Sequence, residues 1–489
     1  MRPTAVLAAL LCAPALAGCI GTSGDDAGAN ALLPVDIAAL LPYLDTSDAH
    51  DHALPGQHRA SWNVGLEGWS PLSPDGSLGR YNHVVLHGNL AFLSAYELPP
   101  GKAPGLAVVD VSDPSAPAVL GTYTSEFLVP IDVALSEDGR FAAIAGHRLT
   151  PPVAAPAAVP SLCQTAPTPD RPRTVCPPYA PAGIELLDVR DPAAPVRVAR
   201  YASAPSGAHT VKLATIDGTL HAFLASYGAH TADRLASSVE ILRHDASVPG
   251  GFAPVSRILP ERPSGGPVFV HDLWVQVHPV TQARLVWIAY WDGGVVIADV
   301  SDVSRPRIVS DWSDFDAATY GNVHFVRPMD ALVDGRHYAV AAPEFSSAEH
   351  AGETYVLDTT DPAAPRLVAT WRLPGDPLTP NDYLHSPHNL DLTRDGFMAI
   401  AHYHAGVWVL DLRPVFAGGA QPLVLGYHFT VPPVDAALET DSFAPNVWAA
   451  AWTPEGRIVA SDIGTGLYVL AIDALAPGTP PYAPVLDGA

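Results

Sequence analysis

Short runs that alternate hydrophobic and polar residues recur along the chain, and pairs of these runs are joined by tight turns. The first example, GLAVVDVSDPSAPAVLGTY, begins at Gly105, and similar segments begin at Gly183, Gly294, Glu353 and Gly406. In each segment a β-type run ends at Asp-Pro or a similar turn, and a second run ends on an aromatic residue. Asp and Pro favour such turns because Asp bonds its own backbone and Pro presets φ. The pattern therefore predicts strand–turn–strand units.

A further pair of predicted strands precedes each of these units. YNHVVLHGNLAFLSAY, from Tyr81, precedes the first, and HSPHNLDLTRDGFMAIAHYH, from His385, precedes the last. A weaker copy of the four-strand unit begins at Ala208, and a partial copy with three strands begins at Pro445. Seven such units are typical of propeller blades. The sequence predicts an all-β, seven-bladed β-propeller, with eight blades as the alternative.

The last unit lacks a fourth strand, and the segment Trp62–Ser70 (WNVGLEGWS) near the N-terminus resembles one. Its Trp69 falls where an aromatic residue ends the second run of other units. Those aromatic residues are Tyr123, Tyr201, Trp312, Trp371 and Tyr427. A strand from the other terminus would cover the open sheet edge. The competing candidate, YAPVLDG in the C-terminal tail (residues 476–489), has no aromatic residue at its end, where the other units carry one.

The repeated turn segments carry a family resemblance. VVDVSDPSAP, LLDVRDPAAP, IADVSDVSRP and VLDTTDPAAP resemble the LVIVD repeat of bacterial and archaeal surface proteins. The resemblance covers most of the chain from Arg80 to Asp473. It implies a β-propeller outside the cytoplasm and implies little about activity. Residues 57–475 are expected to form the propeller, with a Pro-rich insertion at residues 149–182.

The N-terminus reads MRPTAVLAALLCAPALAGC, in which one Arg precedes an apolar run from Ala5 to Ala17. This run is too short to span a bilayer and is typical of a secretory signal peptide. The tetrapeptide LAGC, which ends at Cys19, resembles the lipobox of bacterial lipoproteins, whose Cys is lipidated and becomes the mature N-terminus. Residues 1–18 are expected to be the signal peptide and residues 19–56 a lipidated tether. The resemblance implies an extracytoplasmic, membrane-anchored lipoprotein, periplasmic or at the cell surface.

Two further cysteines, Cys163 and Cys176, lie inside the Pro-rich insertion. In an oxidising compartment, two thiols in a short loop without a core are expected to form a disulfide. A zinc site is the less favoured alternative, because only these two ligands lie nearby.

The amino-acid composition of the chain limits its possible binding partners. The chain has 489 residues, and its 51 Pro and 39 Gly favour many turns and few long helices. Its formal net charge is −24, from 26 basic and 50 acidic residues, and no basic cluster stands out. This charge argues against nucleic-acid binding. We expect a monomer that contacts the membrane through its lipid anchor.

Aligning the predicted blades places a histidine at the start of the first strand in five of the seven. These residues are His83, His209, His271, His324 and His388, whereas Ile131 and Trp448 occupy the same place in the other two blades. Because first strands line the central channel of a propeller, the imidazoles are expected to face one mouth of that channel. The ends of second strands add further polar residues to this face: His147, Asp292, Glu344, His402, His404 and Asp462.

Imidazole and carboxylate ligands in this arrangement suit Zn, Cu or Fe. Because Ile131 and Trp448 interrupt the ring, such a site is expected off the axis, on the side of the fourth to sixth blades. The alternative is structural: each histidine could hold a neighbouring loop through hydrogen bonds of its ring nitrogens. The sequence leaves both interpretations open.

Motifs for common catalytic chemistries are missing. No G-x-S-x-G, H-E-x-x-H, P-loop or dinucleotide-binding motif is present, and a fold by itself assigns no function. We expect a binding module that presents one face to a protein, a glycan or a small molecule. The alternative is a metal-dependent enzyme, an oxidase or lyase, with its site at the histidine-rich mouth.

Overall fold

The structure is a computed structural model, and it describes residues 61–72, 81–95, 105–125, 127, 129–147, 164–167, 172–175, 182–203, 207–226, 238–260, 269–317, 321–345, 352–373, 385–430 and 445–472. These residues form seven antiparallel blades and one separate hairpin. The prediction of a seven-bladed, all-β propeller is confirmed, and the eight-bladed alternative is not.

The first four blades each contain four consecutive strands of the propeller. Blade one contains β3 (Tyr81–His87), β4 (Leu90–Ala95), β5 (Leu106–Asp110) and β6 (Ala118–Tyr123). Blade two contains β7 (Val129–Leu135), β8 (Phe141–His147), β11 (Gly183–Asp188) and β12 (Val196–Ala202). Blade three contains β13 (Ala208–Ile216), β14 (Thr219–Ser226), β15 (Val239–His244) and β16 (Phe252–Ile258). Blade four contains β17 (Asp272–Val277), β18 (Arg284–Ala289), β19 (Val295–Asp299) and β20 (Arg307–Trp312).

The remaining three blades complete the ring with help from the N-terminal segment. Blade five contains β21 (Phe325–Pro328), β22 (Tyr338–Ala342), β23 (Thr354–Asp358) and β24 (Arg366–Trp371). Blade six contains β25 (Leu390–Leu392), β26 (Phe397–Ala401), β27 (Val407–Asp411), β28 (Leu423–His428) and β1 (Ser61–Trp62). Blade seven contains β29 (Val447–Trp452), β30 (Ile458–Asp462), β31 (Gly466–Ile472) and β2 (Val64–Ser70). The short helix α3 (Arg413–Phe416) joins β27 to β28.

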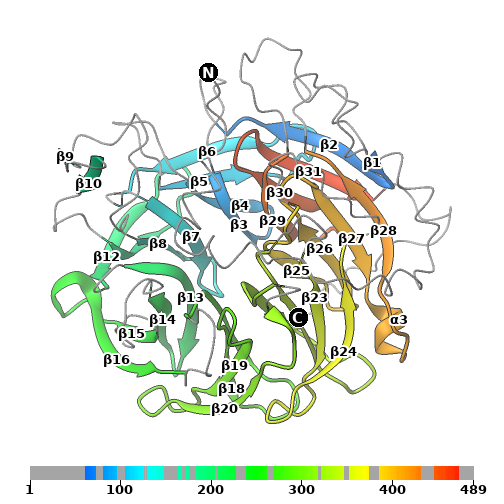
Figure 1. Cartoon of the computed structure of the whole chain (residues 1–489). Coiled ribbons are helices and arrows are strands. Elements are labelled where there is room, and N and C mark those ends of the chain that lie inside the picture. Colours follow the sequence, from blue (N-terminus) through cyan, green and yellow to red (C-terminus); the bar gives the residue numbers. More distant parts are fainter. Residues whose placement is uncertain are drawn as a thin grey trace.

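The first strands of the blades contact one another around the centre. β3 contacts β7 and β29, and the contacts continue around the ring through β13, β17, β21 and β25. Figure 1 shows the blades arranged around this centre. Residues at the start of each first strand are therefore brought together, although they are far apart in the sequence.

Aspartate side chains hold the recurring turn between the third and fourth strands. In blade one, Asp110 and Asp113 each accept the backbone N–H two residues ahead, at 2.8 and 3.0 Å. Asp299 and Asp302 make the same contacts in blade four, at 2.9 and 3.0 Å. The sequence pattern repeats because each blade needs the same side-chain acceptors at this turn.

The N-terminal segment closes the ring across two blades. β2 pairs with β31, with Trp69 opposite Tyr468, and β1 pairs with β28, with Trp62 opposite Tyr427. Asn63, with φ of 55°, joins the two strands. The prediction of closure by an N-terminal strand is confirmed. The structure adds that the segment is divided between blades six and seven.

The aromatic residues that end fourth strands pack between blades. Trp371, at the end of β24, is 2% exposed and lies with its ring centroid 6.0 Å from that of Trp408 in the next blade. Trp408 stacks in turn on Tyr427 at the end of β28, with 4.8 Å between the centroids. Large buried aromatic rings contribute much of a core's apolar contact area, which accounts for their recurrence.

Several predictions fall outside the described residues. The signal peptide, Cys19 and the tether lie there, as do Cys163, Cys176 and the tail 476–489. Within the insertion, β9 (Gln164–Pro167) pairs with β10 (Pro172–Val175), and Gln164 lies opposite Val175. The disulfide stays a prediction. No helix among the described residues is long and apolar enough to cross a membrane.

Candidate functional site

The backbone directs one side chain in or just before each first strand toward the centre. His271, His324 and His388 lie just before β17, β21 and β25 and donate their backbone N–H to second-strand carbonyls at 2.9, 2.9 and 2.8 Å. Ile131, His209 and Trp448 instead lie at register shifts of β7, β13 and β29. A bulge of this kind re-aims a side chain, so both devices bring equivalent residues to one level.

Four imidazoles and one indole follow one another from blade three to blade seven. We call this group the aromatic arc: His209, His271, His324, His388 and Trp448. Successive ring centroids lie 4.2, 4.1, 4.2 and 4.2 Å apart. All five side chains are buried. The structure thus brings together four of the five histidines predicted from the blade alignment.

Two rings of the aromatic arc are held by the backbone of the next blade. His271 Nδ1 lies 3.1 Å from the carbonyl oxygen of His324, and His388 Nδ1 lies 2.7 Å from that of Trp448. A carbonyl can only accept, so each Nδ1 carries the proton and each neutral ring keeps a lone pair on Nε2. One nitrogen of each of these two rings therefore has a structural role, which the sequence analysis gave as the alternative to a metal site.

His324 lacks such support. Its side chain is 2% exposed, and its Nδ1 has no hydrogen-bond partner among the described residues. Its Nε2 lies 3.8 Å from Glu344 Oε2, which is beyond hydrogen-bond distance. The Nε2 of His388 is also buried without a partner in the described part of the chain. A buried polar group without a partner costs about 1–3 kcal/mol, so these nitrogens call for an explanation.

A second pair of buried histidines shows what a structural role looks like in this fold. His278 and His337 have ring centroids 4.5 Å apart, similar to the spacing in the aromatic arc. His278 contacts Thr281 Oγ1 and the carbonyl of Thr359. His337 contacts Thr359 Oγ1 and the carbonyl of Met329. All four ring nitrogens are satisfied here, in contrast to those of His324.

Glu344 is the acidic residue next to the aromatic arc. Its Oε1 accepts a hydrogen bond of 2.6 Å from the hydroxyl of Tyr403. The Asn322 side chain donates to the backbone carbonyl of Glu344 and accepts from its N–H, each at 3.1 Å, which fixes the loop. Burial raises the pKa of the Glu344 carboxyl, and the hydrogen bond from Tyr403 lowers it in part.

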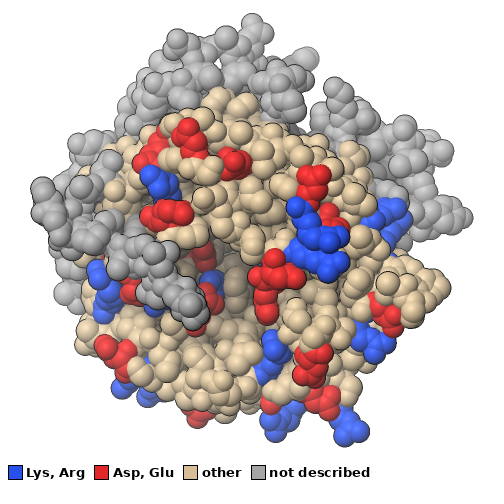
Figure 2. Space-filling model, turned by 180° about the vertical axis from the view of Figure 1, so that it is seen from behind, with Lys and Arg blue, Asp and Glu red and all other residues tan. Residues whose placement is uncertain are grey.

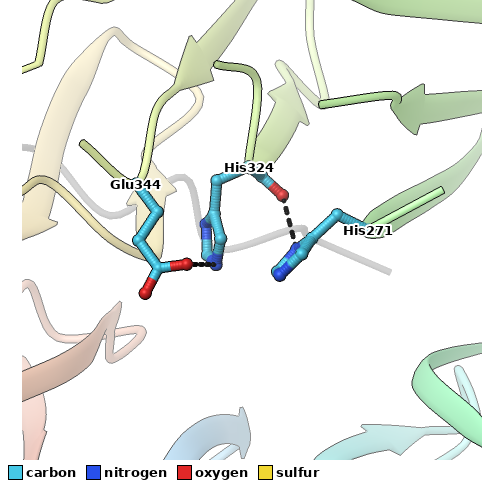
Figure 3. A group of neighbouring side chains, drawn as sticks. All are labelled: His271, His324 and Glu344. Atoms are coloured by element: carbon cyan, nitrogen blue, oxygen red, sulfur yellow. Dashed lines mark hydrogen bonds and ion pairs between the residues drawn. The ribbon is translucent and has the colours of Figure 1, made fainter. Parts of the chain in front are cut away.

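His271, His324 and Glu344 form the cluster with metal-ligand geometry among the described residues. Each offers one ligand atom, and these atoms lie within 4.8 Å of one another. Figure 3 shows the Glu344 carboxylate facing the His324 ring, with the His271 ring beside it. The cluster lies on blades four and five, which is the off-axis side that the sequence predicted for a metal site.

Burial keeps the imidazoles of His324 and His388 neutral. Desolvation, followed by the neighbouring imidazoles, lowers the pKa of His324 well below 6.5. The pKa of His388 is also well below 6.5, mainly through burial. Neutral imidazole is the form that binds metals and accepts hydrogen bonds.

Two aromatic residues beside the aromatic arc have strained backbones. Trp291 has φ of 49° and Tyr403 has φ of 36°, which is the left-handed region. The Trp291 ring centroid lies 5.0 Å from that of His271, and the Tyr403 centroid lies 4.9 Å from that of His388. Strain of about 1–3 kcal/mol at such positions is typical of functional sites.

The sequence analysis did not select Trp291 or Tyr403. A signal was present: each follows a second strand and stands three residues before a glycine that begins the third-strand segment, Gly294 or Gly406. Both glycines also have positive φ, of 81° and 77°. The shared spacing marks equivalent turns in blades four and six.

His83, the fifth histidine, belongs to a separate charged group. Its Nε2 lies 3.6 Å from Asp132 Oδ1, and Asn389 contacts its Nδ1 at 2.7 Å. Lys212 Nζ lies 3.5 Å from Asp132 and 3.6 Å from Asp272. Burial, with a smaller effect of Lys212, lowers the pKa of His83 to about 3. The sequence analysis missed this buried ion-pair group, although Asp132 and Asp272 each directly follow one of the aligned residues, Ile131 or His271.

The remaining predicted residues lie outside the three-ligand cluster. His402 Nδ1 contacts the backbone carbonyl of His385 at 3.0 Å, and its ring lies against Trp371. His404 is half-buried. Asp292 is also half-buried, and burial raises its pKa to about 6.

The surface around the centre carries charges of both signs. Seen from behind, acidic and basic side chains are interspersed, and a hollow near the centre exposes atoms of both kinds (Figure 2). The buried ion-pair group and the aromatic arc both belong to first strands, which surround this centre.

The fold and the aromatic arc define a seven-bladed β-propeller with a histidine-rich centre. Within that class, this chain carries LVIVD repeats: residues 102–125 and 285–313 match the family model of the LVIVD repeat. The matched segments contain the strand–turn–strand unit of blade one and most of blade four. Comparison with curated protein sequences finds no significant match.

Solved propellers resemble the chain weakly. The WD40 β-propeller domain of Doa1 is 11% identical, with 84% of this chain and 96% of that chain covered and a TM-score of 0.43. The C-terminal WD40 domain of Sif2 is 10% identical, with 81% and 83% covered and a TM-score of 0.45. The Myceliophteria thermophila Cps50 (Swd1) β-propeller domain is 11% identical, with 81% and 97% covered and a TM-score of 0.47.

Proposed function

We propose that the protein is an extracytoplasmic, lipid-anchored binding module whose ligand docks at the aromatic arc. An LVIVD-repeat propeller is consistent with an interaction module. The lipobox-like sequence at Cys19 supports the anchor. Binding sites commonly combine aromatic side chains with convergent polar groups, and the aromatic arc offers both in one indole and four imidazoles.

The observation that carries the proposal is the lack of hydrogen bonds on buried imidazole nitrogens. His324 Nδ1 and His388 Nε2 have no partner among the described residues, although the fold satisfies the nitrogens of His278 and His337. A ligand that contacts the aromatic arc would compensate these nitrogens. The strained turns at Trp291 and Tyr403 lie beside the same rings and favour the same interpretation.

The alternative of a metal-dependent enzyme has less support. The LVIVD match brings no activity with it, and the chain has none of the catalytic motifs sought in the sequence. A bound ion at the aromatic arc would be compatible with binding alone. We therefore prefer the binding module.

A thermal-shift screen tests the proposal. The purified chain is mixed separately with divalent cations, monosaccharides, amino acids and short peptides. A ligand that binds the folded state stabilises it by RT ln(1 + [L]/Kd) and so raises the melting temperature. We expect at least one class to raise it, and Trp448→Ala to reduce the shift because the aromatic arc loses a ring. The control is His87→Ala, which changes an exposed histidine at the far end of β3. Absence of any shift, or a shift that Trp448→Ala leaves intact, contradicts the proposal.

A further inference from the structure

We propose that His271, His324 and Glu344 bind one divalent transition-metal ion. This inference rests on the proposed function, in which the aromatic arc is the binding site, and it names the ligand class. The site would consist of two imidazole nitrogens and one carboxylate oxygen from blades four and five, next to Tyr403 of blade six.

The distances fit a shared ion. Ligand atoms bound at about 2 Å from one ion lie between three and four ångström apart in a tetrahedral arrangement. His324 Nε2 and Glu344 Oε2 are 3.8 Å apart, and the three ligand atoms lie within 4.8 Å of one another. A modest inward movement of the side chains is enough to form three bonds. Figure 3 shows that the three side chains face a common point.

Hydrogen bonds to His271 and Glu344 resemble those that usually orient metal ligands in proteins. A metal-bound histidine usually donates its other ring N–H to a carbonyl or a carboxylate, which fixes the tautomer. His271 Nδ1 makes this contact with the carbonyl of His324, so its Nε2 carries the lone pair. Metal-bound carboxylates are held in a similar way, and Tyr403 holds Glu344.

The absence of other partners for the His324 ring is the second independent observation. His324 is 2% exposed, and its ring has an ion-pair contact of 3.8 Å with the Glu344 oxygen but no hydrogen bond among the described residues. Hydrogen bonding therefore does not explain why an imidazole occupies this position. A metal bond would occupy the lone pair of His324 Nε2, and Nδ1 would then carry the proton, still without a partner among the described residues. The buried pair of His278 and His337 has no such vacancy, because its nitrogens are bonded to threonines and carbonyls.

The donor set narrows the choice of ion. Two imidazoles and one carboxylate suit first-row transition ions such as Zn²⁺ or Fe²⁺, whereas Ca²⁺ and Mg²⁺ prefer oxygen ligands. Three protein ligands leave at least one coordination position open. That position could hold water or a donor atom of a second ligand. A metal ion at this place would then help the binding module to hold its ligand.

Isothermal titration calorimetry with Zn²⁺ as the probe tests the proposal. The untagged full chain is first treated with a chelator. We expect one Zn²⁺ to bind to the wild type, and His324→Ala to weaken binding on the order of 100-fold. Glu344→Gln keeps the size of the side chain and should weaken binding at least about 10-fold. Mg²⁺ should not compete at equal concentration.

Matched variants separate a metal site from general damage. His337→Gln changes another buried histidine in blade five and should leave Zn²⁺ affinity unchanged. Because His324 makes no side-chain hydrogen bond among the described residues, His324→Ala should keep the circular dichroism spectrum of the wild type. Absence of Zn²⁺ binding to the wild type, or equal binding to His324→Ala, overturns the inference. If Zn²⁺ does not bind, but another ligand class raises the melting temperature in a way that depends on Trp448, only the metal inference fails. If no ligand binds, the proposed function fails with it.

Discussion

The hydroxyl of Tyr403 in blade six donates a 2.6 Å hydrogen bond to Glu344 Oε1 in blade five. This contact crosses a blade boundary and ends on the carboxylate that faces His324. Tyr403 reaches Glu344 from a turn with φ of 36°, which a tyrosine rarely adopts. The strain and the hydrogen bond together make Tyr403 a positioning residue for Glu344.

Tyr403→Phe removes this hydrogen bond and keeps the aromatic ring. Supporting contacts to metal ligands are typically worth about 10–100-fold in affinity, so we expect Zn²⁺ binding to weaken by a factor in this range. Because the Tyr403 bond lowers the pKa of Glu344, its loss raises that pKa and moves the loss of affinity on acidification to higher pH. Calorimetry at several pH values measures both effects. Tyr290→Phe, which removes another buried hydroxyl, is the control and should bind normally.

Deletion of residues 61–70 tests the closure of the ring. The segment supplies β1 to blade six and β2 to blade seven, so its loss exposes the edges of β28 and β31. Exposed edges favour aggregation, and removal of the fully buried Val64 alone costs about 2 kcal/mol. We expect a large, cooperative drop in melting temperature with aggregation. Deletion of the tail 476–489, the competing closure candidate, should leave the melting temperature unchanged; the reverse result would show that the tail closes the ring.

The fold could be predicted because its determinants are local. Each Asp-Pro or similar turn fixes a pair of strands through aspartate side chains such as Asp110 and Asp113, and these turns together with the weaker and partial copies gave seven blades. The closing strand was predictable from the missing fourth strand of the last unit and from Trp69 in the strand-like segment Trp62–Ser70. Its division at Asn63 was not, because positive φ at a single asparagine leaves no trace in the hydrophobic pattern.

The site was predictable in part. Blade alignment placed four histidines of the aromatic arc at one level, because equivalent repeat positions share backbone geometry. The place of His402 and His404 at the end of a second strand suggested that both face the same mouth, as they would in a strand whose alternation continues without interruption. The positive φ of Tyr403 interrupts that alternation, and Tyr403 reaches Glu344 instead. Periodicity describes regular strands, and it does not describe turns.

Lipidation at Cys19 provides a test of the proposed anchor. Only a thiol accepts the diacylglyceryl group at a lipobox, so Cys19→Ser should leave the chain without lipid. We expect the wild type to partition into the detergent phase and the variant into the aqueous phase. The control is Cys12→Ser, which lies before the lipobox and should partition like the wild type. A wild type that stays in the aqueous phase contradicts the anchor.

Buried neutral histidines should make the fold sensitive to acid. Burial lowers the pKa of His337 from 6.5 to about 4. Between these pH values the unfolded state takes up a proton that the folded state does not, so stability falls as pH falls from 6.5 to about 4. The slope for one such histidine approaches about 1.4 kcal/mol per pH unit.

The variant His337→Gln isolates this contribution, because the raised pKa values of buried carboxyls such as Asp391 act in the opposite direction and are common to both proteins. We expect the variant to be less stable at pH 7, since His337 bonds Thr359 and Met329. Its free energy of unfolding should then fall less steeply on acidification than that of the wild type. Urea denaturation at half-unit steps from pH 7 to pH 4 gives both curves. Parallel curves would mean that His337 titrates alike in the folded and unfolded states, and burial would then not keep it neutral.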